Sequence, residues 1–165
     1  MEKVFGATGR NDQLIVLGTG KAVLIYGYGE EDGMGYDYRQ TFNSKPTKDE
    51  LRRVIDDHIN SLTDKKILSG FVWSGKSVWL SSENQFNFKA AYDLAIQTSG
   101  GSLPVKFKLG EDSEGNPVYH TFKSLSSFTD FYTSALAFIN QTLNEGWVEK
   151  DSVDYDALLG VSNMS

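Results

Sequence analysis

After residue 45, the spacing of apolar residues switches repeatedly between a helical and a strand pattern, which limits the folds open to this chain. Apolar residues at intervals of three and four predict helices in three segments, which are residues 47–63, 82–97 and 126–144. Residues 70–80 and 103–122 alternate apolar and polar residues around turn sequences and predict hairpins, which need no parallel crossover. The order therefore predicts an α+β fold, with an antiparallel sheet of hairpins and helices packed on one face.

Local signals predict where the first helix begins, which face of the second helix is buried and where the third helix ends. Thr47 and Glu50 are spaced so that each side chain can accept a hydrogen bond from the other's backbone amide, which is a capping box. The second helix is expected to bury a stripe made up of Phe86, Ala90, Tyr92, Leu94 and Ala95. Gly146 stands where the third helix is expected to end in a left-handed cap.

The segment FVWSGKSVWL has the composition of a tight hairpin. With Gly75 and Lys76 as the central pair of a primed turn, Trp73 would face Val78 across the hairpin. Side chains alternate along a strand, so Trp79 would lie on the opposite face from Trp73. We expect Trp73 in the core, so that Trp79 is the one of the two that could be exposed.

Residues 1–45 differ from the rest of the chain because they are rich in glycine and carry two short apolar bursts. LIVL at residues 14–17 and AVLIY at residues 22–26 predict strands joined by a GTGK turn. The glycine-rich residues 27–38 are expected to form a loop that ends in YDYRQTF, residues 36–42, where Tyr36 and Tyr38 alternate as in a strand. The predicted organisation is a β arm for attachment or oligomerisation, a compact domain and a flexible tail, which are residues 1–45, 46–156 and 157–165.

Charge and composition argue against several classes of partner. The chain has 165 residues, a formal net charge of -6 and no block of lysine or arginine, so nucleic acid binding is not expected. Its apolar runs are too short to span a bilayer, so membrane insertion is not expected. The absence of cysteine rules out disulfides and thiolate metal sites.

The sequence contains no strong catalytic pattern. The GTGK run lacks the rest of a phosphate-binding loop, because Ile15 and Ala22 stand where glycine and Ser/Thr are required. Acidic residues and serines fall at predicted turns, helix caps and outer helix faces, and His58 falls on an apolar helix face. We therefore expect no enzymatic activity, no catalytic residue, no cofactor and no bound metal.

One surface could bind a ligand. An exposed tryptophan can stack on a sugar ring or on a partner chain. Trp79, with Lys76 and Asn84 near it in the sequence, is therefore a candidate glycan or partner contact.

Several of these segments resemble an uncharacterised domain family of tail-fibre and virion-associated proteins from phages and prophages. The likeness is carried by GKSVWL at residues 75–80, SENQ at 82–85 with Asn87 and Phe88, and the helix over 128–143. The likeness covers about two thirds of the chain. This part of the chain most resembles versions of the domain from phages of gut Bacteroides-type hosts. The glycine-rich arm is not part of the shared domain, and the family offers no catalytic residue.

The resemblance implies a non-enzymatic structural protein of a bacteriophage virion, either a small tail or head fibre or a capsid-associated attachment protein. It would assemble in the host cytoplasm and act as a homo-oligomer, with a homotrimer expected. We expect its arm to dock onto capsid or tail proteins by strand addition. The residues expected at this contact are Leu14, Ile15, Val16, Leu17, Val23, Leu24, Ile25 and Tyr26. The alternative is a virion-surface module that binds a host glycan for host attachment.

Overall fold

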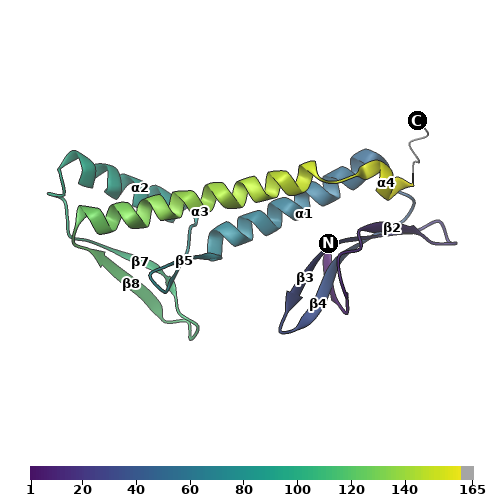
Figure 1. Cartoon of the computed structure of the whole chain (residues 1–165), viewed down its shortest axis with the longest axis horizontal. Helices are drawn as coiled ribbons and strands as arrows, with labels where there is room; N and C mark the ends of the chain where they lie inside the picture. The colour runs from purple at the N-terminus through teal and green to yellow at the C-terminus, as the bar shows by residue number, and fades with distance from the viewer. Residues whose placement is uncertain (161–165) are drawn as a thin grey trace. The chain divides into compact units, whose positions relative to one another are not determined.

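The computed structural model describes residues 1–160, and Figure 1 shows their helices and strands. The chain forms two compact units. The first holds residues 1–59 and the C-terminal segment from residue 150, and the second holds residues 60–149. Antiparallel strands and α-helices make up both units, which confirms the predicted α+β class. The predicted arm lies within the first unit, and its role in attachment stays a prediction.

The first unit contains a four-stranded antiparallel sheet, whose strands are β1 (Glu2–Phe5), β2 (Gln13–Val16), β3 (Ala22–Glu31) and β4 (Met34–Phe42). The order β1-β4-β3-β2 makes β1 and β2 the edge strands. The predicted hairpin between β2 and β3 is confirmed, with Val16 opposite Ala22. The loop expected over residues 27–38 is wrong, because this stretch belongs to the β3–β4 hairpin, whereas the strand expected at its end is confirmed as part of β4. Asp32 and Gly33 both take the positive φ angles that a two-residue turn needs.

The first unit also contains the beginning of α1 (Lys48–Ser69). The predicted capping box is confirmed: the Thr47 backbone amide donates to Glu50 Oε2 at 2.8 Å, and the Glu50 amide donates to Thr47 Oγ1 at 3.3 Å. These two bonds fix the start of the helix, because they satisfy amides that have no partner inside it. The helix extends beyond its predicted end at residue 63.

A short C-terminal helix, α4 (Tyr155–Leu159), contributes to the core of the first unit. The Asp154 carboxylate caps its start, and Gly160 ends it in the left-handed conformation. The buried side chains of this core are Leu24, Tyr26, Leu51, Ile55, Ile59 and Tyr155. The tail predicted over residues 157–165 therefore begins inside a helix, and its residues 161–165 lie outside the described residues.

The second unit contains two short hairpins, which are built from β5 (Phe71–Trp73), β6 (Lys76–Val78), β7 (Val105–Glu111) and β8 (Pro117–Phe122). The predicted register of the first hairpin is wrong, because Trp73 pairs with Lys76 and not with Val78. Its turn uses Ser74 and Gly75, at φ 48° and 74°, one position earlier than expected. Trp73 is buried, as predicted.

Two helices, α2 (Ser82–Gln97) and α3 (Leu125–Asp151), pack with these hairpins around an aromatic core. Ser81 caps α2 by accepting a hydrogen bond from the Asn84 backbone amide. Phe122 of β8 is fully buried in this core, and its ring stacks on Phe128 of α3 with 4.6 Å between centroids. The hairpins and helices are therefore joined mainly by ring packing.

The predicted inner face of α2 is wrong for most of its residues. Ala95 is buried as predicted, and Tyr92 packs half-buried against the core. Phe86 and Leu94 are instead 71% and 50% exposed, Ala90 is exposed, and Phe88 is buried. Both sets of residues have helical spacing, so periodicity alone does not decide which of them enters the core. Packing of α2 against α3 and β7 makes that choice, with Phe88 against Phe107 and Phe131.

Gly146 lies inside α3, so the left-handed cap predicted there is wrong. A Cβ atom at this position would lie 2.6 Å from Oγ1 of Thr63 on α1. The glycine therefore removes a side chain at a close approach between two helices of the second unit. It serves packing and does not end the helix.

Gly146→Ala is expected to lower the free energy of unfolding by about 1–2 kcal/mol, because the new Cβ overlaps Thr63 Oγ1. Thr63→Ala removes this overlap. In that background the same Gly146→Ala change should raise the free energy of unfolding by about 0.5–1 kcal/mol, because alanine is the better helix former. Urea denaturation of the four chains measures both effects, and the same sign in both backgrounds would contradict the close approach.

Candidate functional site

The open edge of β2 is the feature of the first unit best suited to binding another chain. Within the described residues, β2 pairs with β3 alone. The Leu17 backbone amide donates to the Lys21 carbonyl oxygen at 2.8 Å, which identifies a hydrogen-bonded pair of the ladder. Because such pairs alternate along an antiparallel ladder, the N–H and C=O groups of Leu14 and Val16 are turned toward the open edge. This is the geometry that strand addition uses.

The residues expected at the strand-addition contact differ in exposure. Ile15, Val16 and Leu17 are 39%, 50% and 43% exposed, whereas Leu24 and Tyr26 are buried in the core. The remaining three are half-buried, and they are Leu14, Val23 and Ile25. The expectation that AVLIY could serve as an edge strand is wrong, because β3 already has a strand on each side.

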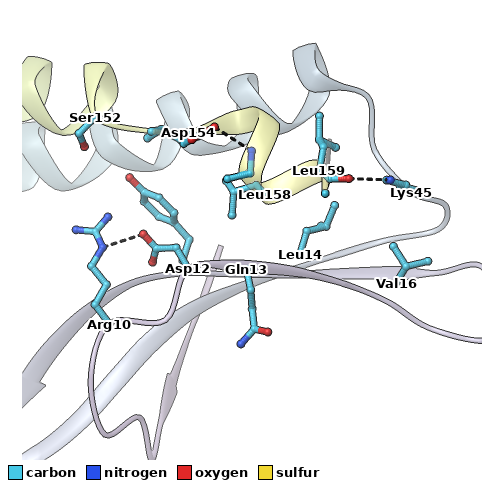
Figure 2. A pocket seen from close by; sticks show the side chains of 14 residues that line it. Arg10, Asp12, Gln13, Leu14, Val16, Lys45, Ser152, Asp154, Leu158 and Leu159 are labelled. Atoms are coloured by element: carbon cyan, nitrogen blue, oxygen red, sulfur yellow. Dashed lines mark hydrogen bonds and ion pairs between the residues drawn. The ribbon is translucent and has the colours of Figure 1, made fainter. Parts of the chain in front are cut away.

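A hollow of about 490 Å³ lies between β2 and the C-terminal segment of the first unit (Figure 2). Leu14 and Val16 point from β2 toward α4, while Gln13 points away from it (Figure 2). Lys45 Nζ donates to the carbonyl oxygen of Leu159 at 2.9 Å, which ties the end of α4 to the segment before α1. The hollow thus has an apolar floor and a polar rim.

The polar rim of this hollow is built from caps and ion pairs. Asp12 accepts hydrogen bonds from Arg10 Nε at 2.8 Å and from the Gly27 backbone amide at 2.7 Å. Asp154 Oδ1 accepts from the Ala157 amide at 2.9 Å. The two Asp12 bonds order the chain around β2, and the Asp154 bond orders the start of α4, so these side chains have structural roles on their own sides of the hollow.

His58 is a buried histidine between two tyrosine rings of the first unit. It is 9% exposed, and its ring centroid lies 4.2 Å from that of Tyr38 and 6.3 Å from that of Tyr26. Its Nε2 has no hydrogen-bond partner within the described part of the chain. Burial, with the positive amino terminus as a further cause, lowers the pKa of His58 to about 4. The imidazole is therefore neutral at pH 7 and packs as a core side chain.

Trp79, Lys76 and Asn84 are held by different contacts. Trp79 is 38% exposed, and Lys108 Nζ lies 5.5 Å from its ring centroid. Lys76 Nζ lies instead 3.3 Å from Nδ1 of His120. Asn84 Nδ2 donates to the backbone oxygen of Trp79 at 2.8 Å. The amide of Asn84 thus supports the backbone of Trp79, and Lys108 lies over the ring.

A second exposed ring lies on the β7–β8 hairpin, whereas Trp79 follows β6, and it was missed by sequence reasoning. Tyr119 is 52% exposed, and Lys106 Nζ lies 4.5 Å from its ring centroid. Lys106 and Lys108 are two residues apart on β7, and Lys108 pairs with Tyr119 on β8, so the three share one face. The alternation in KFKLG, which buries Leu109, could have revealed this outer face.

Comparisons with protein-family models, curated proteins and solved structures find no match to this chain. Among residues 1–160, no group of three or more His, Asp or Glu side chains could hold a metal ion. No helix in the same range has the length and apolar character needed to cross a membrane.

Proposed function

We propose that this protein is a non-enzymatic structural component of a bacteriophage virion. It would be a small fibre or a head or tail attachment protein that works as a homo-oligomer. The edge of β2 would dock onto a capsid or tail protein by strand addition. The resemblance of residues 45–155 to virion-associated domains supports a place in a virion. The open edge of β2 supports docking by strand addition.

The exposed apolar edge of β2 carries this proposal. Soluble proteins usually protect edge strands with charged side chains, proline or a covering element. At the end of β2, three consecutive apolar residues are instead exposed, and they are Ile15, Val16 and Leu17. The backbone groups of Val16 face outward, so an incoming strand would gain both ladder hydrogen bonds and apolar contacts.

Val16→Pro is expected to reduce incorporation of the protein into virions by at least about tenfold, because proline removes an outward N–H and blocks strand pairing. The β2–β3 ladder should persist, since the Val16 amide does not point toward β3. Quantitative mass spectrometry of purified particles measures incorporation. Circular dichroism of the purified chain checks that the fold is kept.

Val16→Thr is the matched control, because threonine keeps the N–H and the branched Cβ at this position. This variant should be incorporated like the natural chain, and normal incorporation of Val16→Pro would contradict the proposal. Deleting the whole arm would be a poorer test, since it would also remove Leu24 and Tyr26 from the core.

Two exposed aromatic rings, Trp79 after β6 and Tyr119 on β8, favour a second candidate function, the binding of a host-surface glycan. The rings of Trp79 and Tyr119 are partly exposed, and each lies beside a lysine ammonium group. Aromatic rings stack on the apolar faces of sugars, and the lysines would favour an acidic polysaccharide.

Trp79→Ala is expected to weaken binding of a capsular polysaccharide by at least about tenfold in calorimetric titrations, since it removes one stacking surface. Trp147→Ala is the control, because Trp147 is 58% exposed and belongs to α3. Equal affinity of the natural chain and the Trp79 variant would remove this candidate.

A further inference from the structure

We propose that the outer face of α2 is the contact surface of a homodimer, in which the α2 helices of two copies pack antiparallel about a two-fold axis at Ala90. This inference goes beyond the proposed function, because it concerns the second unit and does not involve the edge of β2. It depends on an exposed apolar stripe, on the symmetry of that stripe and on a pair of charges at its margin.

Phe86, Ala90 and Leu94 form the α2 stripe, whose members are four residues apart and so lie along one side of the helix. All three are exposed, Phe86 at 71% and Leu94 at 50%. The opposite side of α2 already supplies Phe88 and Ala95 to the core. The helix thus has two apolar sides, and residues 1–160 leave one of them uncovered.

The α2 stripe is symmetric about Ala90. Phe86 and Leu94 lie four residues to either side of it, which is about 6 Å along the helix axis. In an antiparallel pair centred on Ala90, Phe86 of each copy would meet Leu94 of the other, and this reciprocity is what a two-fold interface requires. The small side chain of Ala90 would let the two backbones approach each other at the axis.

The charges at the margin of the stripe are also self-complementary. Lys89 Nζ lies 2.6 Å from Asp93 Oδ2, and the two side chains are 60% and 47% exposed. A two-fold axis at Ala90 keeps this margin on the same side of both helices. It places Lys89 of one copy and Asp93 of the other about 3 Å apart along the direction of the helix axes, within reach of an ion pair. Each lysine could therefore pair with both carboxylates.

The uncovered surface widens toward α3, where an apolar groove of about 200 Å³ runs beside the stripe. Phe86 and Lys89 line one side of the groove, and Leu136 of α3, which is 42% exposed, lines the other. A second copy seated on the stripe would extend over this groove. The groove would thus add contact area to that of a single helix pair.

A two-fold contact gives two copies, whereas the homotrimer expected from the resemblance would need a head-to-tail contact. Sedimentation equilibrium of the full chain should therefore give twice the chain mass. Ala90→Arg should raise the dissociation constant at least about 100-fold, because two like charges would meet at the axis.

Ala137→Arg is the matched control, since Ala137 is an exposed alanine in α3 that does not line the groove. It should dimerise like the natural chain. Both variants should keep their helical circular dichroism, because arginine is a good helix former. A monomeric or trimeric natural chain, or a dimer that persists in Ala90→Arg, would overturn the proposal.

Charge reversal at the margin gives a second, independent test. Lys89→Asp alone and Asp93→Lys alone each place like charges across the interface and should each raise the dissociation constant at least about tenfold. An equimolar mixture of the two variants should form a heterodimer, because their margins then carry opposite charges. A mixture that associates no better than either variant alone would overturn the proposal.

Val16→Pro should leave the dimer unchanged. Loss of virion incorporation with a normal dimer would therefore concern the edge of β2 alone, and loss of the dimer in Ala90→Arg would concern α2 alone.

Discussion

Replacing Phe122 with alanine is expected to lower the free energy of unfolding of the second unit by about 3–5 kcal/mol. Phe122 is fully buried, with ring centroids 4.6 Å from Phe128, 4.9 Å from Phe131 and 5.5 Å from Trp73. These rings come from two hairpins and a long helix. The cavity left by the substitution could not close without moving all of these elements, so most of the loss should persist.

Chemical denaturation followed by near-ultraviolet circular dichroism measures this loss, because the signal reports on packed aromatic rings. Phe86→Ala is the control, since it removes the same side chain from a position that is 71% exposed. It should change the free energy of unfolding by less than about 0.5 kcal/mol at concentrations where the chain is monomeric. Equal losses of unfolding free energy in the two variants would contradict the placement of Phe122 in the core and of Phe86 at the surface.

Acidification should destabilise the first unit through His58. In the unfolded chain His58 has its ordinary pKa of about 6.5, whereas in the folded chain burial lowers that pKa to about 4. Between these two values the unfolded state binds a proton that the folded state does not. The free energy of unfolding should therefore fall as the pH falls through this window, by about 3 kcal/mol in total, and show no such loss above it.

His58→Phe should remove this acid sensitivity, because phenylalanine keeps a ring against Tyr38 and has no group that titrates. The variant should be at least as stable as the natural chain at pH 7, since it also removes the unpartnered Nε2. Urea denaturation at pH 7 and at about pH 4.5 measures both effects. His120, whose pKa is also lowered by burial, is present in both chains, so their difference isolates His58. An equal acid loss in both would contradict this assignment.

Features that depend on neighbouring residues could be predicted from the sequence. The capping box needs only Thr47 and Glu50 three residues apart, and the structure contains both of its hydrogen bonds. The β2–β3 hairpin and the α+β class follow from alternation and turn composition in the same way. The burial of Trp73 was also predicted correctly, although its strand register was not.

The wrong predictions concern choices that distant contacts make. The turn after β5 could use Ser74-Gly75 or Gly75-Lys76, and both pairs fit the local pattern. Phe86 and Phe88 each begin a series with helical spacing, and the fit against Phe107 and Phe131 selects the second. Glycine is common at helix ends, yet the close approach of Thr63 explains better why a glycine stands at position 146.

The candidate binding surfaces were predictable only in part, for the same reason. LIVL could be identified as a strand, but its place at a sheet edge depends on β4 pairing with both β1 and β3. The exposure of Trp79 follows from strand alternation, whereas the lysine over its ring comes from β7, about thirty residues away. The exposure of the α2 stripe depends on which side of the helix enters the core, and contacts of Phe88 with distant rings decide that.

The first unit is discontinuous along the chain, and this has a consequence for synthesis. A ribosome makes residues 1–59 first, then the whole of the second unit, and only afterwards Tyr155, whose side chain packs with Leu24 and Leu51. The core of the first unit, which contains the first residues to be made, is therefore complete only after some of the last residues have been made. A nascent chain that stops before residue 150 would lack Tyr155 and α4, so the part of this core that they cover would stay exposed and open to proteases until they have been made.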